Sequence, residues 1–255
     1  MDTIRTVEIE SGVAMPLLGL GTWEASGSQA YDAVRDALEL GYRHIDTATM
    51  YRNEDQVGRA LRASGVPRRE VFVTTKLHPS SAGAARATLH ASLDALGLER
   101  VDLWLIHWPP GGARPDVWEH LLEAQRDGLA RAVGVSNYSL DQIDELERAT
   151  AHRPAVNQIE WSPALYDEAT LRGHRARGVQ LEGYSPLKTM PLRDPRLARI
   201  AEAHGVTPAQ VVIRWHIEHQ VVVIPKSSRR ERIASNADVF GFSLSADELA
   251  VLDHF

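Results

Sequence analysis

Lysine is rare in this chain, where it accounts for three of the 28 basic residues. Lys76 follows the stretch VFVTT, Lys188 follows YSPL, and Lys226 follows VVVIP. A lysine ammonium is compact and its pKa shifts readily, whereas arginine stays charged. In a chain that otherwise uses arginine, the three lysines are therefore candidates for positions that need a titratable cation.

Four residue types that can transfer a proton follow successive apolar stretches. They are Asp46, Tyr51, Lys76 and His107. A tyrosine titrates near pH ~10, and a neighbouring ammonium should lower that pKa. A carboxylate would hold the lysine in place, and the histidine could donate a hydrogen bond to a substrate oxygen. This set predicts delivery of a proton to a carbonyl oxygen while another group attacks the carbon.

Each of these residues also has a purely structural interpretation. Asp46 could cap a helix, Lys76 could pair with any nearby carboxylate, and His107 could be a buried histidine at a strand end. Four such residues on consecutive strand ends favour the catalytic interpretation.

A basic segment, KSSRRERIASN, follows the last apolar stretch. It places Lys226, Arg229, Arg230 and Arg232 with two serines around a predicted helix N-terminus, where backbone N–H groups favour anions. Arginine can hold a phosphate through two hydrogen bonds. The segment therefore predicts a phosphate site, and an ordinary solvated basic helix is the alternative.

Three other patterns do not complete a known motif. GLGTWE, from Gly19, lacks the third glycine of a dinucleotide fingerprint, and GVSNY, from Gly134, lacks the last glycine of a nucleophile elbow. His216 and His219 are three apart on a predicted helix without the HExxH pattern. We therefore predict no metal site and expect these histidines on a solvated helix face.

These candidate groups need a scaffold that gathers strand ends. Short apolar stretches rich in β-branched residues alternate with stretches of helical periodicity. Eight such strands are expected: LLGLGT from Leu17, RHID to Asp46, VFVTTK to Lys76, VDLWLIH to His107, RAVGVSN to Asn137, AVNQIE to Glu160, VQLEGYS to Ser185 and VVVIPK to Lys226. Near-continuous hydrophobicity predicts a parallel sheet buried on both faces.

An open doubly wound sheet and a closed (β/α)8 barrel both satisfy this alternation, but eight units in about 250 residues favour the barrel. We predict one α/β domain over residues 1–255, with an N-terminal β-hairpin from VEIESGVAMPLL at the end of the barrel. Helices are expected to begin near Ser28, Asn53, Ala82, Pro115, Ser139, Tyr166, Pro195, Pro208 and Ser245.

The composition excludes several functional classes. The formal charge of −6 comes from interspersed charges, which gives no basic face for nucleic acid and no polybasic segment for a membrane. The absence of cysteine excludes disulfides, thiolate nucleophiles and cysteine-type zinc sites. No stretch looks like a signal peptide or a membrane span. We expect a cytoplasmic protein that works as a monomer on a small molecule.

The ordered motifs together resemble the aldo-keto reductase family along nearly the whole chain, and in particular its bacterial NADPH-dependent members. The matching segments are GLGTW, GYRHIDTATMYRNEDQVGRAL, TTK, VDLWLIHWP, GVSN, NQIE, YSPL and IPKSSRRERIASNADVFGF. The resemblance implies a (β/α)8 barrel that binds NADP(H) across its C-terminal rim without a Rossmann domain.

The resemblance also implies residue roles. Asp46, Tyr51, Lys76 and His107 would be the catalytic tetrad, with Tyr51 as the proton donor to the carbonyl of an aldehyde or ketone. Trp23 and Trp108 would line the substrate pocket, with Tyr51 and His107 as its floor. The implied cofactor contacts are Gly21, Thr22, Trp23, Asp46, Ser136, Asn137, Gln158, Tyr184, Ser185, Leu187, Lys188, Lys226, Ser227, Ser228, Arg229, Arg232 and Asn236.

Within that set, Ser136, Asn137 and Gln158 would hold the nicotinamide carboxamide, and Tyr184 would stack on the ring. Ser185, Leu187 and Lys188 would lie along the pyrophosphate. The adenosine 2′-phosphate would sit against Lys226, Ser227, Arg229 and Arg232, which favours NADPH over NADH, and Asn236 would meet the adenine.

The chain departs from the family pattern at Trp161-Ser162, in the short segment between Pro186 and Pro195, and near its end at Phe255. These departures predict an open, permissive pocket. Two alternatives remain: a Schiff-base lyase that uses Lys76 as nucleophile, and a non-catalytic NADPH-binding barrel subunit.

Overall fold

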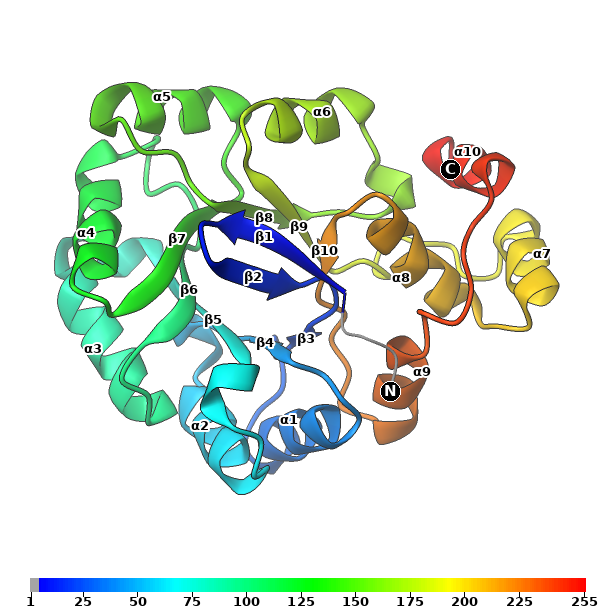
Figure 1. Cartoon of the computed structure of the whole chain (residues 1–255), viewed down its shortest axis with the longest axis horizontal. Helices are drawn as coiled ribbons and strands as arrows, with labels where there is room; N and C mark the ends of the chain where they lie inside the picture. The colour runs from blue at the N-terminus through cyan, green and yellow to red at the C-terminus, as the bar shows by residue number, and fades with distance from the viewer. Residues whose placement is uncertain (1–4) are drawn as a thin grey trace.

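The strands of this chain form a ring with helices outside it (Figure 1). The structure is a computed structural model that describes residues 5–255. An eight-stranded sheet runs in the order β10-β9-β8-β7-β6-β5-β4-β3, and its neighbouring strands are parallel. The strands are β3 (Leu20–Gly21), β4 (His44–Asp46), β5 (Phe72–Leu77), β6 (Val101–Ile106), β7 (Ala130–Ser136), β8 (Val156–Glu160), β9 (Gln180–Tyr184) and β10 (Val222–Val223).

The ring closes between its first and last strands. Leu18 bridges Val223 and Gly21 bridges Lys226, both in the parallel sense. The closed barrel predicted from the sequence is therefore confirmed, and the open doubly wound sheet is excluded. Closure matters for function because it brings every carboxyl strand end to one rim.

Ten helices surround the ring within residues 5–255 (Figure 1). They are α1 (Ser28–Glu39), α2 (Glu54–Ala63), α3 (Ala85–Leu96), α4 (Pro115–Arg126), α5 (Leu140–Thr150), α6 (Glu168–Ala176), α7 (Pro195–His204), α8 (Pro208–Glu218), α9 (Arg230–Ala237) and α10 (Ala246–Asp253). Short 3₁₀ turns are η1 (Thr49–Tyr51), η2 (Arg68–Glu70), η3 (Pro79–Ala84) and η4 (Pro163–Leu165). No described helix is long and apolar enough to cross a membrane.

Helix starts follow the sequence signals with two exceptions. Ser139, Thr207 and Ser245 each form a capping box with the residue three positions later, which satisfies two backbone N–H groups at once. α3 begins later than predicted because the 3₁₀ turn η3 occupies the residues before Ala85. α6 begins at Glu168 because Asp167 caps it, whereas Tyr166 stays extended.

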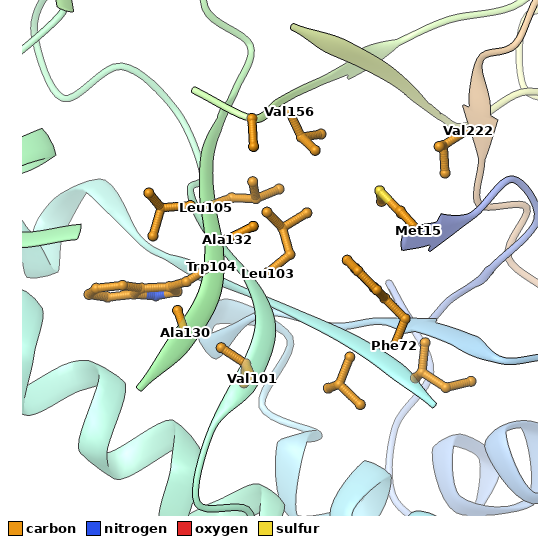
Figure 2. Close-up of a cluster of buried hydrophobic side chains, with 14 of the residues drawn as sticks. Met15, Phe72, Val101, Leu103, Trp104, Leu105, Ala130, Ala132, Val156 and Val222 are labelled. Carbon is orange, nitrogen blue, oxygen red and sulfur yellow. The ribbon is translucent and has the colours of Figure 1, made fainter. Parts of the chain in front are cut away.

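The N-terminal hairpin covers one end of the barrel (Figure 1). It pairs β1 (Thr6–Glu10) with β2 (Val13–Pro16) across the predicted Ser-Gly turn, where Gly12 has a φ of 73°. Met15 on this hairpin is fully buried and points into the barrel beside Phe72 and Val222 (Figure 2). The hairpin therefore closes the end of the barrel opposite the rim.

Two apolar clusters hold the fold together. The larger fills the barrel and the layer between the strands and helices α1 to α5, with fully buried Leu103, Leu105 and Trp104 on β6 (Figure 2). The smaller joins Trp161 and Leu181 to the helices α7, α8 and α10. Both faces of the strands are thus buried, which leaves the carboxyl rim as the place for polar side chains.

Candidate active site

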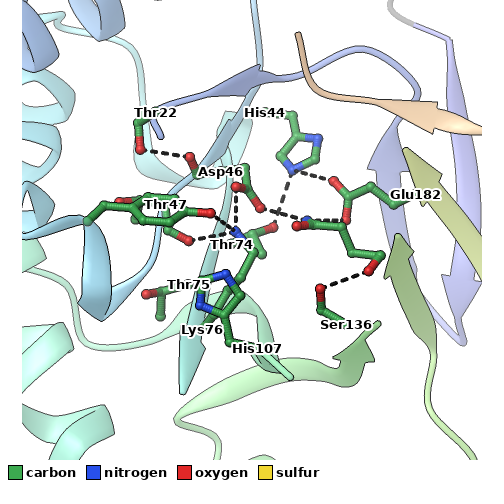
Figure 3. A network of polar contacts seen from close by, with 12 residues as sticks. Thr22, His44, Asp46, Thr47, Thr74, Thr75, Lys76, His107, Ser136 and Glu182 are labelled. Atoms are coloured by element: carbon green, nitrogen blue, oxygen red, sulfur yellow. Dashed lines mark hydrogen bonds and ion pairs between the residues drawn. The ribbon is translucent and has the colours of Figure 1, made fainter. Parts of the chain in front are cut away.

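The four predicted catalytic residues come together at the carboxyl rim, where Figure 3 shows Asp46, Lys76 and His107. Asp46 ends β4, Lys76 lies near the end of β5, His107 follows β6, and Tyr51 ends the turn η1. Lys76 Nζ lies 2.5 Å from Asp46 Oδ1 and 3.3 Å from Tyr51 Oη. The centroids of the Tyr51 and His107 rings are 5.6 Å apart.

Lys76 is a completely buried cation with three oxygen partners. Besides Asp46 and Tyr51, it donates to the backbone carbonyl of Thr47 at 3.0 Å. Burial alone would lower the pKa of Lys76, but its charge interactions with Asp46, Tyr51 and Glu182 and its hydrogen bond to Asp46 together outweigh burial, so the net shift is upward. Lys76 therefore stays protonated and cannot serve as a free-amine nucleophile near neutral pH.

Tyr51 faces the cleft with its hydroxyl directed at Lys76. Burial raises the pKa of Tyr51, and the positive charge of Lys76 offsets only part of that increase. The ammonium does lower the pKa of Tyr51, as predicted, but desolvation of the phenolate is the larger effect and the net shift is upward. A phenol that keeps its proton is suited to donate it.

His107 is neutral in this site. Burial, followed by the positive charge of Lys76, lowers the pKa of His107 to about 2. Its ring stacks on Trp108 with centroids 3.9 Å apart and planes 20° apart. Its Nδ1 has no hydrogen-bond partner within residues 5–255. Because Nδ1 is buried, a substrate oxygen in the cleft that this ring lines would accept from the other ring nitrogen, Nε2, of the uncharged imidazole.

Asn53 fixes the loop that carries Tyr51. Its Nδ2 donates to the carbonyls of Thr22 at 3.0 Å and Ala25 at 2.8 Å, and its Oδ1 accepts from Thr47 Oγ1 at 2.8 Å. Arg52 follows Tyr51 in the left-handed region, with a φ of 54°. Sequence reasoning recognised Asn53 only as a helix start, so its part in positioning Tyr51 was missed.

A cleft of about 270 Å³ opens above these residues. Trp23 and Trp108 stand at its sides, 45% and 37% exposed, and Trp23 packs edge-on against Tyr51 with centroids 5.0 Å apart. The remaining lining residues are Gly21, Asp46, His107, Gln158, Glu160, Tyr184, Ser185, Lys188, Ile224 and Lys226. The four predicted substrate residues thus share one cavity with Gln158 and Tyr184, whereas Ser136 and Asn137 do not line it.

A larger hollow of about 990 Å³ lies at the amino ends of the strands, so volume alone does not identify the site. Several arginines line it, but they bind local groups. Arg62 donates to the Leu96 carbonyl, while Arg68 and Arg131 both bind Asp102. These contacts fasten the bottom of the barrel, and we assign no chemistry to them.

The predicted carboxamide-binding residues are interlocked beside the cleft. Ser136 Oγ donates to the Gln158 carbonyl at 2.8 Å. Asn137 Nδ2 donates to Ser136 Oγ at 3.0 Å and to the His107 carbonyl at 3.2 Å, and its Oδ1 accepts from Tyr184 Oη at 2.9 Å. Gln158 donates through Nε2 to two carboxyl groups, which leaves its amide oxygen as an acceptor at the cleft.

The basic segment lies at the start of α9, as predicted. Arg229 is the N-cap residue of α9, and no side chain caps the first backbone N–H groups of this helix. Arg229 and Arg232 are exposed, and Lys226 lines the cleft. Arg230 is separate from this group, because its Nη1 lies 2.7 Å from Asp36 and 2.8 Å from Glu39.

The remaining predicted cofactor contacts differ in exposure. Ser185 lines the cleft in the left-handed region with a φ of 53°. Lys188 is 72% exposed and lies 3.8 Å from Glu160. Others in this set are Thr22 and Asn236, which are buried, Leu187, which is half-buried, Ser227, which is buried, and Ser228, which is exposed.

The two helical histidines do not match either interpretation of them. His216 is completely buried, with its ring nitrogens 2.8 Å from the Val212 carbonyl and 3.1 Å from that of Trp161. His219 is mostly buried and pairs with Asp253 at 2.8 Å. The predicted solvated face is therefore wrong, since His216 packs against Trp161 and Gly183 and α10 covers His219. Among the described residues, no cluster of three or more metal-ligating side chains is present.

The fold is a (β/α)8 barrel with candidate proton-transfer groups at its carboxyl rim, and comparison with known proteins gives the family. The aldo/keto reductase family model matches residues 17–255. Morphine 6-dehydrogenase of Pseudomonas putida is 45% identical, over 97% of this chain and 90% of that protein. Glyoxal reductase of Bacillus subtilis is 40% identical, over 97% and 91%.

Solved structures agree. An aldo/keto reductase from Brucella melitensis superimposes with a TM-score of 0.94 at 38% identity, covering 98% of this chain and 99% of that one. The chain belongs to the aldo/keto reductase family, and the resemblance seen in its motifs is confirmed. It is therefore an oxidoreductase of that family.

Proposed function

We propose that this protein reduces the carbonyl group of an aldehyde or ketone to an alcohol with NADPH, and that it runs the reverse reaction with NADP⁺. The observation that carries the proposal is the set of contacts around Tyr51. Its hydroxyl lies at the cleft floor, 3.3 Å from a buried ammonium that is itself 2.5 Å from a carboxylate. This arrangement supports donation of a proton to an oxygen in the cleft.

We assign each of the four rim residues a separate role in the reduction. Tyr51 gives its proton to the carbonyl oxygen, and Lys76 stabilises the phenolate that remains. Asp46 keeps Lys76 charged and in place. His107, uncharged, donates a hydrogen bond that orients the carbonyl. When bound, NADPH supplies the hydride from C4 of its nicotinamide to the carbonyl carbon, and water later returns the proton to Tyr51.

The rim fits the nicotinamide end of such a cofactor. Both N–H groups of the Gln158 side chain are bound to carboxyl groups, which fixes the orientation of the amide. The Gln158 amide oxygen is then the atom left to accept a hydrogen bond from the nicotinamide carboxamide. Asn137 and Ser136 support the same surface, and Tyr184 is held upright by its bond to Asn137. We propose that the ring stacks on Tyr184, with Gly21, Thr22 and Trp23 on the opposite strand end.

The path to α9 fits the phosphates. Ser185, Leu187 and Lys188 would border the pyrophosphate, and Asn236 the adenine. The 2′-phosphate would meet Lys226, Ser227, Ser228, Arg229 and Arg232 beside the uncapped N–H groups of α9. Two free arginines and a lysine around one phosphate support NADPH over NADH.

We expect the double substitution Arg229→Ala/Arg232→Ala to raise the KM for NADPH by about 10²-fold, since each charge-assisted hydrogen bond contributes roughly 1.5–3 kcal/mol. The KM for NADH should change by less than about 3-fold by the same reasoning, because NADH lacks the 2′-phosphate. Steady-state assays with both cofactors measure this.

Arg230→Ala is the matched control on the same helix, because Arg230 already binds Asp36 and Glu39. Its KM for NADPH should stay within about 3-fold of wild type. Equal losses for NADPH and NADH in the double variant would refute the phosphate assignment.

The proposed activity is tested by following NADPH absorbance with the purified chain and a panel of short α-dicarbonyls, aromatic aldehydes and cyclic ketones. We expect turnover with several members, since two exposed tryptophans border an open cleft. No NADPH oxidation across the panel would refute the proposal. The substrates named for relatives, glyoxal among them, are natural first choices.

The two alternative functions have less support. A Schiff-base lyase needs a neutral lysine amine, whereas Asp46 keeps Lys76 charged. A non-catalytic NADPH-binding subunit would not need Asp46, Lys76 and Tyr51 in mutual contact. Borohydride trapping on Lys76 would revive the first alternative, and tight NADPH binding without turnover the second. That the protein works as a cytoplasmic monomer stays a prediction.

A further inference from the structure

A second buried carboxyl group lies beneath the proposed catalytic residues. Glu182 is on β9, completely buried, two residues before Tyr184 and on the same face of the strand (Figure 3). It is in register with Gln158 on β8 and Val222 on β10. No role for Glu182 follows from the proton transfer described above, although burying a carboxyl group is costly unless something pairs with it.

Gln158 connects Glu182 to the catalytic residues. A primary amide nitrogen has two N–H groups, and both are used here. One reaches Asp46 Oδ2 at 2.8 Å and the other reaches Glu182 Oε2 at 2.9 Å. The amide therefore bridges the two buried carboxyl groups, and its rotation is blocked from both sides.

The far oxygen of Glu182 points toward His44 (Figure 3). Oε1 lies 3.7 Å from His44 Nε2 and has no hydrogen-bond partner within residues 5–255. Thr74 Oγ1 is 3.2 Å from the same nitrogen. Oε1 accepts no hydrogen bond and lies beside the buried imidazole of His44. If Glu182 is protonated, this is the oxygen that would carry the proton.

The surrounding charges favour the protonated form of Glu182. Burial, together with the negative charge of Asp46, raises the pKa of Glu182 to about 8. Burial and the positive charge of Lys76 lower the pKa of His44 to about 3, so the imidazole is neutral. The ionisable groups that face Glu182 are His44 and Asp46 from β4, Lys76 from β5 and Tyr51 from η1. They include a single cation, which Asp46 already neutralises.

We propose that Glu182 is a positioning residue for the carbonyl reduction: as a neutral acid it fixes the Gln158 amide, and through that amide it holds the Asp46 carboxylate against Lys76. The same bond directs the remaining oxygen of Gln158 toward the cleft. This inference rests on the proposed function, because the pair it supports is the one that serves Tyr51.

Two substitutions of nearly equal shape separate the bridge from simple packing. Glu182→Gln keeps an oxygen that accepts from Gln158 and adds N–H groups that can reach His44, so it imitates the neutral acid. Glu182→Met fills the same space without either bond. We expect kcat for an aldehyde to stay within about 3-fold of wild type in Glu182→Gln, and to fall by about 30-fold in Glu182→Met with the aldehyde KM little changed.

Glu54 provides the matched control. It is also a buried carboxyl group, bonded to Thr75 Oγ1 at 2.6 Å and Ser92 Oγ at 3.2 Å, but it has no bond to Gln158. Glu54→Gln and Glu54→Met should both keep kcat within about 3-fold of wild type once folded. A loss in Glu54→Met as large as that in Glu182→Met would overturn the bridge, and so would equal losses in the two Glu182 variants.

Thermal unfolding against pH gives a measurement that does not depend on activity. The folded-state pKa of Glu182, about 8, lies above its unfolded value, so its contribution is fully present below the unfolded pKa and is lost as pH rises toward 8. The Tm of wild type should therefore fall relative to Glu182→Gln between pH about 5 and 8 and run parallel above that range.

The outcomes distinguish the two proposals. A wild-type chain that oxidises no NADPH refutes the proposed function, and this inference with it. An active wild type whose kcat is unaffected by Glu182→Met refutes the inference alone. A difference in Tm between wild type and Glu182→Gln that does not change with pH also overturns the inference, because Glu182 would then not be the neutral acid that the bridge requires.

Discussion

Replacing Tyr51 with phenylalanine is expected to lower kcat for aldehyde reduction by about 10³-fold, within the range that general-acid catalysis supplies. The substitution removes the hydroxyl that lies 3.3 Å from Lys76 Nζ and leaves the ring against Trp23 and His107. Because the ring contacts remain, the Kd for NADPH should stay within about 3-fold of wild type. Single-turnover kinetics and quenching of tryptophan fluorescence by NADPH measure the two quantities.

Tyr42→Phe is the control for this substitution. Tyr42 is also buried, and its hydroxyl donates to the Ile233 carbonyl at 3.1 Å, away from the cleft. Losing that bond should cost about 1 kcal/mol of stability and leave kcat within about 2-fold of wild type. Full activity in Tyr51→Phe would show that another group donates the proton.

The sequence was sufficient to predict which residues meet at the rim, because neighbouring strands of a parallel barrel follow one another in the chain and end at the same side. Asp46, Lys76 and His107 each follow a run of buried β-branched or aliphatic residues, so their positions at strand ends followed from periodicity alone. Tyr51 was harder, since it lies on a 3₁₀ turn rather than a strand. Its assignment depended on its residue type and on its place just beyond the end of the second predicted strand.

Polar residues inside the barrel were missed for a physical reason. His44 and Glu182 interrupt strands that otherwise appear hydrophobic, and a sequence does not show which partner lies across the barrel. The strand period of two was the available signal: His44 shares a face with Asp46, and Glu182 shares one with Tyr184. Interior polar groups below a catalytic residue on the same face are therefore candidates for supporting it.

The ends of the sheet and the charge balance required the structure. The eighth strand was predicted to run to Lys226, but β10 covers Val222–Val223, and beyond it the pairing is reduced to the isolated bridge between Gly21 and Lys226, because Pro225 has no N–H to donate. The ammonium of Lys76 was predicted to lower the pKa of Tyr51, and it does, but burial raises that pKa by more. Desolvation depends on every surrounding atom, so local spacing does not determine its size.

The buried ion pair is where stability and catalysis are most closely joined. Asp46 and Lys76 are both inaccessible to solvent, and removing one partner would leave the other charge buried without compensation. Removing both leaves no such charge. The cost of breaking the pair should therefore differ from the cost of replacing it, whereas proton transfer should fail in either case, because Lys76 is what stabilises the Tyr51 phenolate.

Lys76→Met is accordingly expected to lower the free energy of unfolding by about 3–5 kcal/mol and to lower kcat by about 10³-fold. Asp46→Asn/Lys76→Met should recover about 2 kcal/mol or more of that stability without recovering activity. Urea denaturation and NADPH oxidation measure the two effects.

Lys188→Met is the matched control, because Lys188 is 72% exposed and its ion pair with Glu160 should contribute less than about 1 kcal/mol. A double variant whose destabilisation equals the sum of the single variants would show that the buried pair is not coupled, and a double variant that regains activity would show that Tyr51 does not depend on the ammonium.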